Sequence, residues 1–218
     1  MILFSGDSFS AYDDSESWTY HFAKNMNLNF KNYSIEGSSF WSAFEKLDVE
    51  DYRILENYYD YLVITCTNYR RIPFCQNPHD SAFYGKVESE PLDSEKKKHN
   101  MAHINYYDRF YSEKMHKFLY ERLLEFIITK FCNHTKIIFL PVVEDSLISI
   151  KKTYNIWPDN IIFLNFPLID ISSIDKKSKN HFTKETNKVF GKLLAERVKQ
   201  INSGPVNLTT QEIKDAIK

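Results

Sequence analysis

The chain has 218 residues, of which 43% are hydrophobic and 16% aromatic, and its formal net charge is −1. This length and apolar content are typical of one globular domain and exclude an intrinsically disordered chain. The balanced charge gives no basic excess for nucleic acid, and no run approaches the ~20 apolar residues of a membrane-spanning helix. We therefore expect no nucleic-acid or membrane partner and, because no cleavable signal is recognisable, a cytoplasmic location.

Short apolar runs alternate with longer amphipathic stretches along the chain. Strands are predicted at Met1–Ser5, Asn32–Glu36 (the weakest), Tyr61–Cys66, Lys136–Leu140 and Asn160–Phe166. Three of them are nearly continuous in Ile, Leu, Val and Phe, which indicates burial on both faces of a parallel sheet. Helices are predicted at Ser15–Asn25, Ser39–Leu47, Ser112–Phe131 and Thr183–Ile201 from apolar residues at helical spacing. This order predicts an α/β domain, with about five parallel strands in a doubly wound sheet and helices on both faces.

The domain is predicted to cover residues 1–202. Within it, residues 73–100 are polar, contain Pro78 and Pro91, and are interpreted as an irregular insertion or lid. The chain breaks at Ser203-Gly204-Pro205, so residues 203–218 are predicted to form a C-terminal tail. A short helix is expected there, because Thr209 and Glu212 have the spacing of a capping box.

The first chemical motif is Gly6-Asp7-Ser8, directly after the first predicted strand. Parallel sheets bind ligands at the carboxyl ends of their strands. Gly6 allows a sharp turn there, and Ser8 would stand where a helix begins, with its own N–H directed at an anion. Alone the motif is weak, because Ser and Asp are more often ordinary helix caps.

Three further motifs follow the same pattern. Gly37 comes after the second strand and could direct a backbone N–H to the same edge, while Asn68 follows the third strand and offers an amide donor suited to an oxyanion. His181 precedes the last long helix. Each has an ordinary alternative: a turn glycine, a turn-capping Asn and an exposed His. Together with Ser8 they supply nucleophile, backbone donor, amide donor and base, the groups that acyl transfer requires.

The four residues Ser8, Gly37, Asn68 and His181 resemble the SGNH, or GDSL-type, hydrolase superfamily, which is named for its Ser, Gly, Asn and His. The resemblance spans nearly the whole chain and implies a flavodoxin-like three-layer fold. It also implies ester or thioester hydrolysis through an acyl-enzyme on Ser8, with His181 as base. The implied oxyanion hole consists of the N–H groups of Ser8 and Gly37 and the amide of Asn68.

Two positions depart from the family pattern. Cys66 stands where the family usually has Gly, two residues before its Asn, and Ser178 stands where it usually has Asp, three residues before its His. Asp175 is the nearest carboxylate before His181 and is our candidate for orienting it. Asp170 and a Ser–His dyad held by a backbone carbonyl are the alternatives. Loss of the orienting acid can lower turnover by a factor on the order of 10⁴.

The substrate is expected to be a small-molecule or carbohydrate ester, with O-acetyl groups on carbohydrate as one candidate. Asp7, Arg70 and Arg71 are candidate substrate-binding residues, since arginine suits an anionic or sugar substrate, although surface arginines in a loop explain the pattern equally well. Transfer of the acyl group to another acceptor would use the same residues and is a third interpretation of the function.

The main alternative is an inactive SGNH-like module that binds or has a structural role, which Ser178 favours. A nucleotide-binding flavodoxin-like protein ranks lower, because the chain has no Gly-rich phosphate loop. No cofactor is expected. A metal site is not predicted either, since His99 and His103 have helical spacing without a further candidate ligand.

Overall fold

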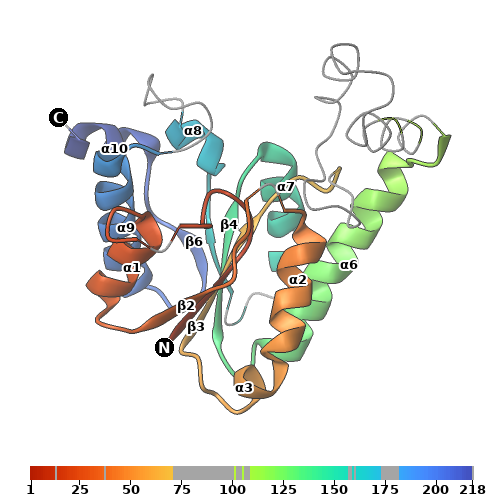
Figure 1. The fold of residues 1–218 in the computed structure, drawn as a ribbon, viewed down its shortest axis with the longest axis horizontal. Helices are drawn as coiled ribbons and strands as arrows, with labels where there is room; N and C mark the ends of the chain where they lie inside the picture. Colours follow the sequence, from red (N-terminus) through yellow and green to blue (C-terminus); the bar gives the residue numbers. More distant parts are fainter. Residues whose placement is uncertain are drawn as a thin grey trace.

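The computed structural model describes residues 1–12, 14–36, 38–70, 101, 105, 109–156, 159, 161–172 and 182–217. These residues form one parallel six-stranded sheet in the order β2-β1-β3-β4-β5-β6 (Figure 1). The strands are β1 (Ile2–Ser5), β2 (Phe30–Asn32), β3 (Tyr61–Cys66), β4 (Lys136–Pro141), β5 (Ile161–Leu164) and β6 (Gly204–Val206). The doubly wound topology that the sequence predicts is confirmed, with one strand more than expected. The predicted insertion at residues 73–100 lies outside the described residues.

Helices cover both faces of the sheet (Figure 1). One face packs against α1 (Trp18–Met26), α8 (Leu168–Ser172), α9 (Lys184–Val198) and α10 (Thr210–Ile217). The other packs against α2 (Phe40–Val49), α3 (Asp51–Leu55), α6 (Glu113–Phe131) and α7 (Glu144–Tyr154). Successive strand residues alternate between the two cores, so that Ile2 and Phe4 face α1 and α9 while Leu3 faces α2. No helix among the described residues is both long and apolar enough to cross a bilayer.

The four predicted long helices begin close to the positions that the sequence predicts, whereas α7 was not predicted. A hydroxyl caps each of the four, as Ser17, Ser39, Ser112 and Thr183 accept the backbone N–H three residues further on. Such a bond satisfies one of the N–H groups that the first helical turn leaves unpaired. The capping hydroxyls therefore fix where α1, α2, α6 and α9 start.

Two predicted elements differ from the structure. The second strand ends at Asn32 instead of starting there, because its Oδ1 accepts the N–H of Ser34 at 3.0 Å and turns the chain. The predicted tail, in turn, contributes strand β6, whose Val206 is paired with Leu164 of β5. Residues 204–206 therefore belong to the sheet. The predicted short helix is present as α10, and Thr209 and Glu212 form the expected reciprocal capping bonds.

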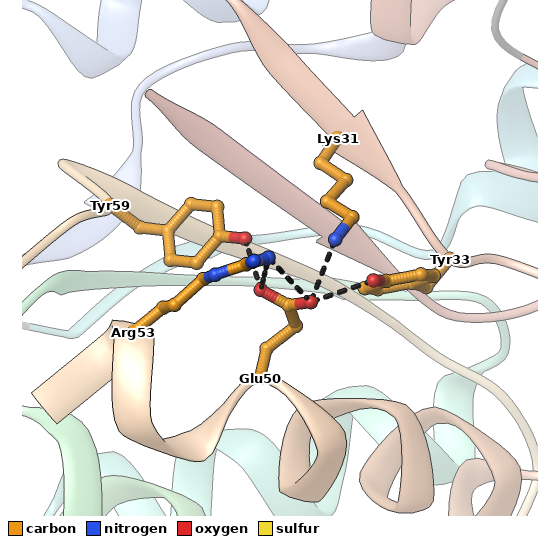
Figure 2. Close-up of polar contacts among 5 residues, drawn as sticks. All are labelled: Lys31, Tyr33, Glu50, Arg53 and Tyr59. Carbon is orange, nitrogen blue, oxygen red and sulfur yellow. Dashed lines mark hydrogen bonds and ion pairs between the residues drawn. The ribbon is translucent and has the colours of Figure 1, made fainter.

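The buried carboxylate of Glu50 links the edge strand β2 to the junction between helices α2 and α3 (Figure 2). Glu50 lies between α2 and α3 with its side chain only 4% exposed. It accepts hydrogen bonds from Lys31 Nζ and Tyr33 OH, both at 2.7 Å, and from Tyr59 OH at 2.5 Å. Arg53 Nη1 lies 3.2 Å from both carboxylate oxygens. The cluster joins β2, the α2–α3 junction and the segment that enters β3.

Candidate active site

The two described members of the predicted constellation follow neighbouring strands. Because β1 pairs with both β2 and β3, the strand order reverses between β1 and β3. Open α/β sheets bind ligands at such a switch point, at the carboxyl ends of the strands. Ser8 comes shortly after the end of β1, and Asn68 comes shortly after the end of β3. The topology therefore places both at the edge of the sheet where a ligand is expected.

The turn that carries Ser8 is fastened to β3 by the Thr65 hydroxyl. Thr65 Oγ1 accepts the N–H of Asp7 at 3.0 Å and lies 2.8 Å from Ser10 Oγ. A Cβ atom on Gly6 would lie 1.7 Å from the same oxygen, so only glycine fits this close approach. Ser10 N–H closes the turn on the carbonyl of Asp7 at 3.0 Å. Ser8 itself is half-buried on this rigid turn.

Asp7 has a different position from the one the sequence suggested. Its side chain is fully buried, and its Oδ1 accepts the N–H of Phe9 at 3.2 Å. A carboxylate shielded in this way cannot reach a substrate while the turn keeps its form. Asp7 thus helps to hold the Ser8 turn, and its buried side chain is not in a position to contact a substrate.

The segment after β2 is bonded to the Ser8 turn as well. Ser38 Oγ donates to the carbonyl of Gly6 at 2.9 Å, and Asn32 Nδ2 donates to the carbonyl of Ser10 at 2.7 Å. The segments that follow β2 and β1 are therefore bonded to one another, and Thr65 near the end of β3 is bonded to the Ser8 turn. Gly37, the predicted backbone donor, lies outside the described residues, but its neighbour Ser38 is one of these bonded residues.

The Asn68 side chain is held by the turn that follows it. Its Oδ1 accepts the N–H of Arg70 at 2.8 Å, and this bond uses the carbonyl end of the amide, so Nδ2 points the other way. Tyr69 OH and Arg70 Nη2 both donate to Glu113 Oε1, at 2.7 and 3.1 Å. These two bonds hold the pKa of Glu113 below its ordinary value. The Arg70 guanidinium thus pairs with α6, and a substrate contact for it stays a prediction; Arg71 lies outside the described residues.

The predicted base His181 lies outside the described residues, as do Asp175 and Ser178. Its neighbour Phe182 is described, and its ring packs edge-on against Phe9 with 5.6 Å between centroids. Phe9 directly follows Ser8 in the chain, so the residues after Ser8 and His181 are in contact. Of the candidate acids, the alternative Asp170 is described and lies exposed on α8.

Cys66 lies beneath this edge of the sheet, at the end of β3. Its side chain is fully buried in the core on the α2 and α6 side, and burial raises the pKa of its thiol well above the ordinary value. The thiol therefore stays protonated and packs as a small apolar group. Within the described ranges, no group of three or more His, Cys, Asp or Glu side chains is placed to hold a metal ion.

Sequence reasoning missed the groups that support the site. Thr65 lies in the predicted strand Tyr61–Cys66 and Glu113 in the predicted helix Ser112–Phe131, and the sequence predicts no further role for either. The partners of both become visible once the strand register and the position of α6 are known. Asn32 carried a local signal, since an Asn at a strand end is typical of a turn that its side chain stabilises.

Comparison with known proteins gives one distant similarity to report. No protein-family model matches the chain, and no match was found among curated proteins. A solved structure of a candidate lipolytic protein of the G-D-S-L family from Desulfitobacterium hafniense DCB-2 aligns with 87% of this chain and 94% of its own. The sequence identity is 15% and the TM-score 0.41. This likeness is too distant to assign an activity, which we therefore argue from the site.

Proposed function

We propose that the chain is a serine esterase that cleaves a small-molecule or carbohydrate ester through an acyl-enzyme on Ser8. The main support is the position of Ser8 and Asn68 after the neighbouring strands β1 and β3 at the switch point of the sheet, with the Ser8 turn held by bonds to Thr65, Ser38 and Asn32. The contact between Phe9 and Phe182 adds that the chain next to His181 lies against the chain next to Ser8.

In the proposed reaction, His181 takes the proton of Ser8 Oγ as this oxygen attacks the ester carbonyl carbon. The negative charge that develops on the carbonyl oxygen is stabilised by the N–H groups of Ser8 and Gly37 and by Asn68 Nδ2. The tetrahedral intermediate then expels the alcohol, which takes the proton from His181. Water activated by His181 hydrolyses the acyl-enzyme and restores Ser8. Asp175 is our candidate for orienting His181.

Covalent labelling tests the nucleophile directly. We expect the wild-type chain to hydrolyse 4-nitrophenyl acetate and to react with a fluorophosphonate probe at a single serine, and Ser8→Ala to do neither. Ser15→Ala is the matched control, because Ser15 is an exposed hydroxyl in the same connection between β1 and α1. Equal labelling or equal turnover in wild type and Ser8→Ala would rule out Ser8 as the nucleophile.

A module that binds but does not hydrolyse is the second candidate. It is favoured by Ser178, which occupies the position of the usual orienting acid. Such a module would show neither a burst nor steady turnover with 4-nitrophenyl acetate. If turnover is present, replacing Asp175 and Asp170 by Asn, one at a time, separates an oriented triad from a dyad, since a triad loses rate on one of these changes and a dyad on neither.

A further inference from the structure

A pocket of about 180 Å³ lies between the β1–α1 connection and the beginning of α9. Phe9, the residue after Ser8, and Phe182, the residue after His181, both line it. The pocket is therefore lined by the chain neighbours of the two residues that the proposed function makes nucleophile and base. Sites for whole drug-sized ligands commonly measure about 300–1,000 Å³, so this pocket suits one ring of a substrate.

The walls of the pocket are preformed by contacts within the protein. Thr19 Oγ1 and Asn32 Nδ2 donate to the carbonyl of Tyr12, at 2.6 and 3.2 Å, and Tyr12 OH donates to Glu36. Trp18 Nε1 donates to the carbonyl of Phe9. Because the walls are already held in place, ligand binding costs little free energy for ordering side chains.

The polar groups of the pocket set the charge of its ligand. Glu16 and Lys184 approach from opposite walls and form an ion pair, which cancels their charges. Asp14 adds one carboxylate, and its Oδ1 accepts the N–H of Glu16 at 3.0 Å. An anionic ligand is disfavoured by this carboxylate. Asn187 lines the wall as well, and its Nδ2 donates to the carbonyl of Phe182 at 3.4 Å, so donors and acceptors lie together beside aromatic rings.

From this combination we propose that the pocket is the leaving-group subsite of the enzyme and binds a neutral, polyhydroxylated ring, that is, a sugar. Hydroxyl groups both donate and accept, so they match carboxylate, amide and ammonium groups set side by side. The C–H faces of a sugar ring pack on the exposed faces of aromatic side chains. The inference rests on the proposed function for the position of the ester, which would extend from the ring toward Ser8.

Binding and turnover are measured separately to test this. Saturation-transfer NMR follows the binding of methyl glucoside, with choline as the cationic comparison, to wild type, Ser8→Ala, Asn187→Leu and Lys188→Met. Lys188 is the matched control, an exposed residue of α9 that does not line the pocket. Turnover is followed with an O-acetylated glucoside and with 4-nitrophenyl acetate.

We expect methyl glucoside to bind to wild type, Ser8→Ala and Lys188→Met, and to lose its transfer signal with Asn187→Leu. The same variant should lower kcat/KM for the acetylated glucoside about tenfold more than for 4-nitrophenyl acetate. Absence of binding to wild type, stronger binding of choline, or equal binding to Asn187→Leu overturns the subsite. Binding without turnover of either ester refutes the esterase and the leaving-group role, yet leaves a sugar pocket demonstrated.

Discussion

Replacement of Glu50 by Gln should remove a defined part of the acid sensitivity of the fold. Burial on its own raises the pKa of this carboxyl, but hydrogen bonds from Lys31, Tyr33, Tyr59 and Arg53 outweigh it and lower the pKa from 4.5 to about 2 (Figure 2). A carboxyl with a depressed pKa in the folded state stabilises the fold fully above its unfolded pKa. That stabilisation is lost as the pH falls toward the folded value. For Glu50 the loss therefore occurs between about pH 4.5 and pH 2.

The size of the effect follows from the two pKa values. A change from 4.5 to about 2 corresponds to at most about 3.4 kcal/mol of unfolding free energy, at 1.36 kcal/mol for each tenfold change in proton affinity. The Lys31 and Arg53 side chains are 35% and 54% exposed, so water screens their part of the interaction. We therefore expect a contribution of about 2 kcal/mol at neutral pH. In Glu50→Gln the side-chain NH₂ group of Gln would also face a donor, because every group that contacts the Glu50 carboxylate is a hydrogen-bond donor.

Urea unfolding at a series of pH values from 7 to about 2.5 measures this contribution. Glu50→Gln should be less stable than wild type by about 2 kcal/mol at pH 7, and the difference should shrink steadily below pH 4.5. The control Glu45→Gln changes an exposed carboxyl of α2, the helix that ends next to Glu50. A gap between wild type and Glu50→Gln that stays constant down to pH 2.5 would show that the ionised carboxylate is not the stabilising species.

Three further changes test the packing and the site. Gly191→Ala places a Cβ 2.5 Å from the carbonyl oxygen of Trp18, where α1 and α9 meet; it should lower stability by about 1–3 kcal/mol in urea unfolding, and unchanged stability would contradict the close approach. Gly6→Ala should abolish probe labelling at Ser8, because its Cβ collides with Thr65 Oγ1; normal labelling would show that the turn is dispensable. Asn68→Ala should keep its melting temperature and lose about 100-fold in kcat, whereas retained kcat would remove Asn68 from the oxyanion hole.

The central part of the fold could be predicted from the sequence because its signals are local. Runs such as Tyr61–Cys66 are apolar at nearly every position, as a strand buried on both faces requires. Ser39, Ser112 and Thr183 mark helix starts through bonds to the chain three residues on.

The elements that were missed have weak local signals. Strand β6 is a short Gly-Pro-Val segment, a composition typical of a turn, and it becomes a strand only because the edge of β5 pairs with it. Helix α7 turns two apolar residues, Leu147 and Ile150, fully toward the core, while hydroxyls occupy other buried positions. With only two apolar residues on its buried face, α7 shows little hydrophobic periodicity in the sequence.

For the candidate site, the rule that ligand groups follow parallel strands predicts Ser8 and Asn68, which do follow the neighbouring strands β1 and β3. It could not find the groups that hold them, because these depend on register. Thr65 meets Gly6 only because Ser5 is paired with Ile64, which brings the next residue of each strand side by side. No spacing along the chain encodes this pairing.

The support beneath Ser8 determines what kind of variation the site can tolerate. The Ser8 turn is tied to β3 through Thr65 and to the segment after β2 through Ser38, so its position follows from strand register. Hydrogen bonds at this edge therefore constrain the position of Ser8, the proposed nucleophile, through strand register. The orienting acid carries no such constraint, since a carboxylate from any segment near His181 could fill that role. In the proposed esterase, the sheet edge would thus fix Ser8, while the acid could come from a neighbouring segment such as the one that carries Asp175.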